Sequence, residues 1–144
     1  MSVDPALLGG LDLVADIEVS RLAPVARRLT ERDLPADCTL IRQGQPATSF
    51  ALVLDGELDV TRRTDGGDEH LAVIGPGSIV GELALLRRRA RVATVSTEGP
   101  ARVLVGDREA LVALLHLPQV VERLRSLVSR RLAEDARPVV VESG

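Results

Sequence analysis

The feature that most constrains the fold is a change in the spacing of apolar residues along the chain. Between residues 31 and 106, short apolar runs alternate with Gly, Pro and Asp, as in "SFALVLDGELDV" and "HLAVIGPG". Runs of this kind, separated by turn residues, are typical of antiparallel strands. The pair Asp55–Gly56 and the run 65–67 predict tight turns, because glycine adopts positive φ without a steric penalty. This segment therefore predicts an antiparallel β-roll of about eight short strands.

The two ends of the chain follow a helical period instead. Asp4 and Pro5 predict a helix start, with Asp as the N-cap, and apolar residues then recur at helical spacing. The helical period returns after Asp107, the expected N-cap of a C-terminal helical segment that Pro118 should interrupt. We therefore expect one α+β domain over residues 1–135, with helices at 5–30, a jelly-roll-like eight-stranded β-roll at 31–106, helices at 107–134, and a tail at 136–144.

Composition and charge narrow the class of protein. The 144-residue chain is 45% hydrophobic with a formal net charge of −3, which fits a globular domain and argues against a general nucleic-acid or membrane-surface protein. Nothing at the N-terminus resembles a signal peptide, and no apolar stretch is long enough to span a bilayer, so we expect neither a secreted nor a membrane-spanning protein. Cys38 is the only cysteine, which excludes an internal disulfide and fits a buried thiol in a reducing compartment. We expect a cytoplasmic protein.

The sequence contains little that indicates a catalytic site. His70 and His116 are the only histidines, too few for a histidine-rich metal site, so we expect neither a metal nor a cofactor. No Ser, His and Asp occur in a recognisable catalytic context, and Cys38 has no histidine nearby in sequence to activate it. The glycines of "GPGSIVG" lack the spacing of a dinucleotide fingerprint. We therefore expect a protein that is not an enzyme.

The stretch 81–94, "GELALLRRRARVAT", predicts a binding site for an anion. The first amides of a short helix lack partners and carry partial positive charge, and Gly81 lets the backbone approach a ligand closely. Arg91, which we expect at the start of the next strand, can return to the same place with a two-pronged guanidinium. Glu82 can accept hydrogen bonds from sugar hydroxyls. An anion receptor beside a hydroxyl receptor describes the phosphate and ribose of a nucleotide.

This pattern resembles the phosphate-binding cassette of cyclic nucleotide-binding domains, the family of the bacterial cAMP receptor protein. The run "GELALL", four intervening residues and then "RVAT" have the family's spacing, with Glu82 and Arg91 nine positions apart. Gly44, Gly56 and Gly77 match further landmarks of the family. The resemblance extends over most of the chain. The segments "RQGQPATSF", "PGSIVGELALL" and "LLHLPQVVERL" most resemble the regulatory domain of bacterial cAMP-regulated protein lysine acetyltransferases.

The resemblance implies a role for each residue of the cassette. Gly81 and the amides of residues 82–84 would cradle the cyclic phosphate, Glu82 would bind the ribose 2′-hydroxyl, and Arg91 would pair with the exocyclic phosphate oxygens. Val92 would lie near phosphate and base, and it lacks the hydroxyl that helps to hold guanine, so cAMP should be preferred over cGMP. The expected ligand-binding residues are Gly81, Glu82, Leu83, Ala84, Arg91, Val92 and Ala93. The neighbouring Arg87, Arg88 and Arg89 are expected to form a solvated basic rim.

The cap over the base is the part of the site that the sequence leaves open. Many members of the family use an aromatic residue of the last helix, but the only aromatic residue here is Phe50, which is expected in a strand and in the core. An aliphatic or arginine cap remains, with Leu124, Val128 and Arg131 as the main candidates and Leu132 as a further one. Core or dimer packing is the alternative role for the aliphatic candidates.

The expected function is a cAMP-binding sensor that transmits nucleotide occupancy through its C-terminal helices to a downstream protein or effector domain. One alternative is a regulatory fragment of a cAMP-dependent protein lysine acetyltransferase. Another is a non-binding scaffold of the same fold, which the presence of both Glu82 and Arg91 disfavours, because unpaired buried charges are costly. We expect no binding to DNA, since too few residues follow Ala133 for a helix-turn-helix. The net charge of −3 leads us to expect no binding to membranes either. A homodimer through the C-terminal helix is left open.

Overall fold

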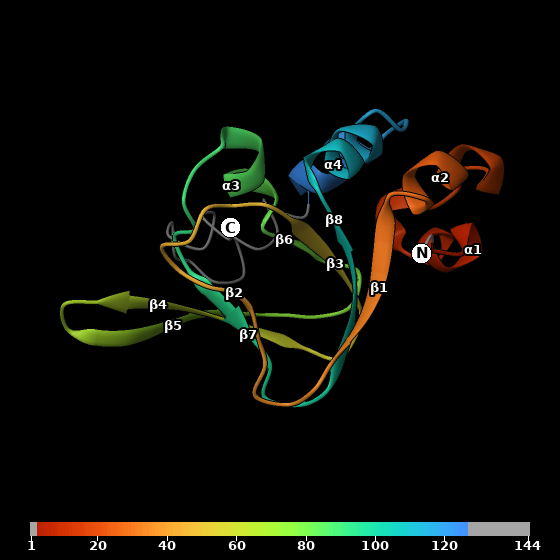
Figure 1. Cartoon of the computed structure of the whole chain (residues 1–144). Helices are drawn as coiled ribbons and strands as arrows, with labels where there is room; N and C mark the ends of the chain where they lie inside the picture. Colours follow the sequence, from red (N-terminus) through yellow and green to blue (C-terminus); the bar gives the residue numbers. More distant parts are fainter. Residues whose placement is uncertain (1–2, 127–144) are drawn as a thin grey trace.

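The computed structural model describes residues 3–126, which form a β-roll with helices at both ends (Figure 1). Asp4 caps the first helix, because its carboxylate accepts a hydrogen bond from the Ala6 amide at 2.9 Å, and Pro5 occupies the first turn, as predicted. The helical region ends earlier than predicted, and Leu29, which we had assigned to a helix, begins the first strand. The N-terminal elements are α1 (Pro5–Gly9), the 3₁₀ helix η1 (Asp12–Val14) and α2 (Val19–Ala26).

The eight predicted strands are present within residues 3–126 and pair antiparallel throughout. They form two four-stranded sheets, ordered β1-β8-β3-β6 and β2-β7-β4-β5. The fold prediction is therefore confirmed. The strands are β1 (Leu29–Leu34), β2 (Thr39–Ile41), β3 (Phe50–Asp55), β4 (Leu58–Thr64), β5 (Gly67–Ile74), β6 (Ile79–Val80), β7 (Thr94–Ser96) and β8 (Ala101–Gly106).

Strand β3 separates two hydrophobic cores, because successive side chains of a strand point to opposite faces. Phe50 and Leu52 face a core shared with α1, α2 and α4 (Arg108–Leu115), and Phe50 is 1% exposed, as predicted for a core residue. Ala51 and Val53 face the second core, which fills the space between the two sheets. Figure 1 shows α1, α2 and α4 together on one side of the roll and the β4–β5 hairpin extending from another.

Two of the connections that carry the chain from one sheet to the other are short turns. The predicted turn at Asp55–Gly56 links β3 to β4, and the turn at Gly99–Pro100 links β7 to β8. Gly56 has a φ of +83°, and a Cβ there would lie 2.6 Å from the carbonyl oxygen of Pro100. The two connections therefore pack directly against each other. Neither forms a hairpin within one sheet; the turn that does is the predicted one at residues 65–67, between β4 and β5.

Cys38 lies in the connection between β1 and β2 and is half-buried, so the prediction of a buried thiol is only partly correct. Its backbone carbonyl accepts a hydrogen bond from the Thr97 amide at 2.9 Å, which holds the connection at the margin of the second core. The part of the chain that the structure describes contains no helix long and apolar enough to cross a membrane.

The C-terminal helical segment is interrupted as predicted. Asp107 caps α4 by accepting a hydrogen bond from the Ala110 amide at 2.9 Å. The helix ends at Leu115, three residues before Pro118, and the chain turns before becoming helical again over residues 120–126. Val120 is fully buried in the core beneath the helices. The start of this last helix is therefore anchored in the core.

Candidate functional site

The candidate site is built around the start of α3 (Glu82–Arg87), the short helix that the sequence predicted. Strand β6 ends one residue before Gly81, and Gly81 turns the chain into the helix with a φ of +84°, in the left-handed region. A Cβ at this position would lie 2.9 Å from Nη1 of Arg91 and 2.9 Å from Cδ1 of Ile41. Both the backbone conformation and the close approach of Arg91 therefore require glycine here.

Arg91 returns to the start of α3, as the sequence indicated. Its side chain donates from Nη1 to the carbonyl oxygen of Gly81 at 2.8 Å and from Nη2 to the carbonyl oxygen of Ser49. Only 5% of Arg91 is exposed. We expected Arg91 to open a strand, but β7 begins at Thr94, and Arg91 lies in the segment that leads into it.

The backbone of Arg91 is held as firmly as its side chain. The Arg91 amide donates to the carbonyl of Gln45 at 2.8 Å, and the carbonyl of Arg91 accepts from the amide of Gly44 at 2.9 Å. Gly44 has a φ of +89°, which the turn between β2 and β3 requires. The connection between β2 and β3 therefore forms a clamp around residue 91.

Glu82 is 1% exposed and lies in the first turn of α3, so the site holds a buried carboxylate beside a buried guanidinium. Burial lowers the pKa of the Arg91 guanidinium below its usual value, and the negative charge of Glu82 opposes that shift. The guanidinium starts from a pKa so high that it stays charged at neutral pH. A bound anion would stabilise the buried guanidinium of Arg91 by adding a second negative charge beside it. The carboxylate of Glu82 could accept hydrogen bonds from hydroxyl groups.

The other predicted site residues divide into two groups. Leu83 and Val92 are half-buried, and they flank the positions of Glu82 and Arg91 in the chain. Ala84 and Ala93 are 5% and 2% exposed, and Ala93 packs into the core between the sheets. The structure therefore brings Gly81, Glu82 and Arg91 together, while the side chain of Ala93 serves packing.

The candidates for a base cap are only partly placed. Leu124 is half-buried and packs against the core shared with the helices, which is the alternative role considered from the sequence. Val128, Arg131 and Leu132 lie outside the described residues.

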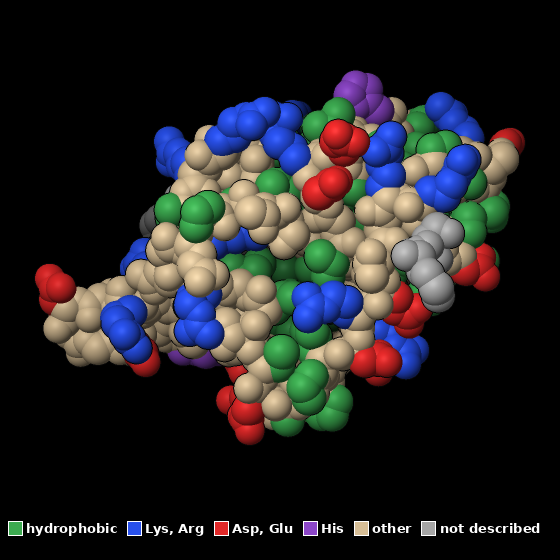
Figure 2. All heavy atoms as spheres, in the orientation of Figure 1, with side chains coloured by type: hydrophobic (Ala, Val, Ile, Leu, Met, Phe, Trp, Pro, Cys, Tyr) green, Lys and Arg blue, Asp and Glu red, His purple; other side chains and the backbone are tan. Residues whose placement is uncertain are grey.

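Arg87, Arg88 and Arg89 are exposed, as expected for a basic rim. Figure 2 shows arginine side chains gathered on the surface over α3. Arg88 is the C-cap residue that follows α3, with a φ of +54°. Arg91 is set apart from these three by its burial and by its hydrogen bonds to the carbonyl oxygens of Gly81 and Ser49.

Sequence reasoning missed the carbonyl of Ser49 as a partner of Arg91. Every residue has a backbone carbonyl, so the sequence could not predict that this one binds Arg91. The clamp of residues 43–45 had one signal, the glycine of "RQGQP", which marked a turn but not what the turn holds. Within residues 3–126, no group of three or more His, Cys, Asp or Glu side chains is placed to hold a metal ion.

The sequence of this chain is similar to those of several known proteins. The family model described as "cyclic nucleotide-binding domain" matches residues 31–116. The acetyltransferase Pat of Mycolicibacterium smegmatis is 37% identical over 140 residues, which cover 97% of this chain and 42% of Pat. A CRP-like cAMP-activated global transcriptional regulator of Mycobacterium tuberculosis is 27% identical over 88% of this chain and 57% of that protein.

Solved structures agree with these matches. A cAMP-binding acyltransferase from Mycobacterium smegmatis superposes with a TM-score of 0.81 at 36% identity, over 91% of this chain and 41% of that one. The catabolite activator protein of Thermus thermophilus gives a TM-score of 0.70 at 29% identity, over 85% of this chain and 58% of that one. The chain thus spans between about two fifths and three fifths of the length of these relatives.

Proposed function

This chain belongs to the cyclic nucleotide-binding domain family, and we propose that it is a regulatory module that binds cAMP and passes nucleotide occupancy on to an effector. The observation that carries the proposal is the pair of buried charges at the start of α3, where Glu82 and Arg91 are 1% and 5% exposed. A domain that had lost its ligand would gain nothing from keeping both charges out of water. Their burial therefore favours a binding module over a scaffold of the same fold.

The proposed ligand contacts follow from the chemistry of the site. The guanidinium of Arg91 and the first amides of α3 would receive the cyclic phosphate, with Gly81 allowing its close approach. The carboxylate of Glu82 would accept the ribose 2′-hydroxyl. Val92 is half-buried and carries no hydroxyl for guanine, which supports a preference for the adenine nucleotide. No cofactor is needed for this function.

Transmission would use the C-terminal helices. Helix α4 packs on the same core as Phe50, and Val120 anchors the helix that follows the turn at Pro118. Arg123 of that helix donates to the carbonyl of Ala15 at 2.6 Å, so the last described helix also contacts the N-terminal helical segment. Nucleotide binding would be transmitted to a partner through these helices. Val128 and Arg131 remain candidates for the base cap.

A second candidate is the same module acting as the regulatory part of a larger acetyltransferase. The match to Pat favours it, because 97% of this chain aligns with 42% of that enzyme. On this proposal the catalytic machinery lies outside the matched region, and this domain contributes regulation alone. A cytoplasmic location and a homodimer through the C-terminal helix stay predictions.

A thermal unfolding comparison tests the proposal. A ligand that binds only the folded state at 100 times its Kd stabilises it by about 2.7 kcal/mol, which raises the Tm of a domain of this size by about 5–10 °C. We expect cAMP to produce this shift and 5′-AMP, which lacks the cyclic phosphate, to produce little. A Tm that is indifferent to saturating cAMP would favour the scaffold.

A further inference from the structure

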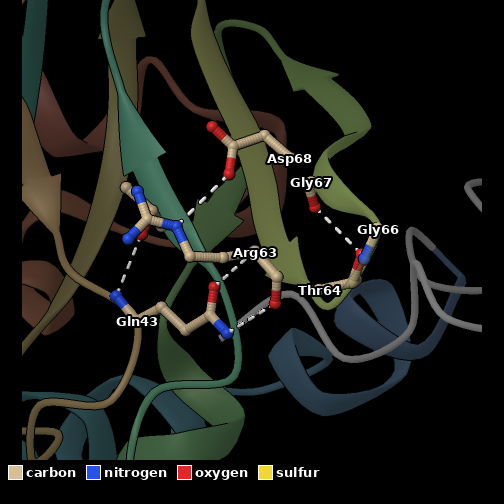
Figure 3. Close-up of polar contacts among 7 residues, drawn as sticks. Gln43, Arg63, Thr64, Gly66, Gly67 and Asp68 are labelled. Atoms are coloured by element: carbon tan, nitrogen blue, oxygen red, sulfur yellow. Dashed lines mark hydrogen bonds and ion pairs between the residues drawn. The ribbon is translucent and has the colours of Figure 1, made fainter.

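Gln43 lies beside the β4–β5 hairpin and is hydrogen-bonded to Arg63 (Figure 3). Its side-chain amide makes two hydrogen bonds with the backbone of Arg63 in β4. The Arg63 amide donates to Oε1 of Gln43 at 2.7 Å, and Nε2 of Gln43 donates to the Arg63 carbonyl at 3.3 Å. The side chain of Gln43 therefore pairs with Arg63 as a neighbouring strand would.

The sheet explains why a side chain takes this place. Strand β4 pairs with β7 only from Asp59 to Thr61, and the last pair joins Thr61 to Thr94, the first residue of β7. Strand β4 continues past this pair to Thr64, where β7 has no residue left to pair with it. The backbone groups of Arg63 that point away from β5 would lack a protein partner, and Gln43 supplies one.

The backbone around Gln43 holds the other side of this junction. The Gln43 amide donates to Oγ1 of Thr94 at 3.0 Å. The next two residues hold Arg91, since the Gly44 amide donates to the Arg91 carbonyl at 2.9 Å and the Arg91 amide donates to the Gln45 carbonyl at 2.8 Å. Residues 43–45 thus hold the segment 91–94 by hydrogen bonds, and Gln43 also binds the β4–β5 hairpin.

We propose that Gln43 is a positioning residue for the nucleotide: it fixes the Arg91 segment against the β4–β5 hairpin and so helps to set the affinity for the phosphate. This inference rests on the proposed cAMP binding. A guanidinium whose backbone is already held loses less freedom when it binds an anion, so the complex is tighter. By linkage, a bound phosphate must in turn steady the hairpin through the same bonds.

Gln43→Met tests the proposal, because methionine keeps the length of the side chain and removes both hydrogen bonds to Arg63. Arg63 is exposed, so water can replace the lost partner and the fold should survive. We expect the Kd for cAMP to rise about fivefold with little change in Tm. Gln45→Met is the matched control, because Gln45 is exposed and holds Arg91 through its backbone carbonyl, which the substitution retains.

Two readouts separate positioning from a purely structural role. In an Arg91→Ala background, Gln43→Met should change the Kd for cAMP by less than twofold, because the residue it positions is gone. In the NMR spectrum of the ¹⁵N-labelled chain, cAMP should move the Arg63 amide signal in the wild type and not in Gln43→Met. If Gln43→Met does not fold, Thr94→Val removes the acceptor at the other end of Gln43 and carries the same expectations.

The outcomes distinguish this inference from the proposed function. If wild-type protein binds cAMP and Gln43→Met binds it equally well, Gln43 does not position Arg91. A fivefold loss that persists undiminished in the Arg91→Ala background also overturns the inference, because Gln43 would then act through another group. A wild-type chain that fails to bind cAMP overturns the proposed function itself.

Discussion

Arg91 reaches back along the chain to Gly81, where its Nη1 donates to the backbone carbonyl at 2.8 Å. The same approach leaves no room for a side chain, since a Cβ on Gly81 would lie 2.9 Å from that nitrogen. The two ends of the cassette are therefore fitted to each other, and protein contacts fix the guanidinium at the start of α3. Preorganisation of this kind favours tight anion binding.

Arg91→Ala should weaken cAMP binding by one to two decades, because a charge-assisted hydrogen bond contributes roughly 1.5–3 kcal/mol. Arg88→Ala is the matched control from the exposed rim, and its smaller loss should shrink as salt is raised. Titration of both variants at low and high ionic strength checks this, with circular dichroism to confirm the fold. Equal losses in the two variants would show that the register assigned to the cassette is wrong.

Gly81→Ala should harm both stability and binding, whereas Gly77→Ala should harm stability alone. Both glycines have positive φ, at +84° and +89°, so alanine at either site costs about 1–2 kcal/mol in the free energy of unfolding. Nothing lies within 4 Å of a Cβ at Gly77, while one at Gly81 meets Arg91. Denaturant unfolding and cAMP titration of both variants measure the difference. Unchanged cAMP affinity in Gly81→Ala would contradict the fitted geometry.

Glu82→Gln should weaken cAMP binding by about tenfold, because the hydrogen bond from the ribose 2′-hydroxyl loses its charged acceptor. The nucleotide 2′-deoxy-cAMP lacks that hydroxyl and provides the control. The wild type should prefer cAMP over 2′-deoxy-cAMP by about the same factor, and the variant should discriminate much less. If both proteins show the same ratio of the two Kd values, Glu82 does not contact the ribose.

A chain that ends at Ser126 should fold but bind cAMP more weakly than the full chain. It keeps Val120, which is fully buried, and the candidate cap Leu124, and it lacks the candidate caps Val128 and Arg131. Cutting directly after Pro118 would remove Val120 from the core and confuse the two effects. Phosphate and ribose contacts remain in the shortened chain, so binding should fall without being lost. Unchanged affinity would assign the cap to residues within 3–126.

Much of the fold was predictable because local patterns and tertiary packing agree. Turn glycines and alternating runs marked the strands, and Asp4 and Asp107 marked two helix starts that the structure confirms. Leu29 was misassigned because an apolar residue at the end of a helical stripe fits equally well at the start of a strand. Which strands share a sheet was not predictable, because the turn at Gly99–Pro100 reads like a hairpin and instead joins two sheets.

The sequence predicted only those parts of the site that are formed by characteristic side chains. The spacing of Glu82 and Arg91 marked the buried pair, and the structure brings both to the start of α3. The carbonyl of Ser49 and the clamp formed by Gly44 act through the backbone, where the residue type carries little information. Gln43 was equally hidden, because its role depends on where β7 begins relative to β4.

Calorimetric titration of the purified wild-type chain with cAMP, and in parallel with cGMP, tests the central claim most directly. We predict saturable binding of cAMP at one site per chain, with cGMP bound more weakly by about 1 kcal/mol, or roughly fivefold in Kd, because Val92 offers guanine no hydroxyl. Absence of saturable cAMP binding would contradict the assignment of the buried pair Glu82 and Arg91 to a nucleotide. Equal or tighter binding of cGMP would contradict the predicted preference for cAMP.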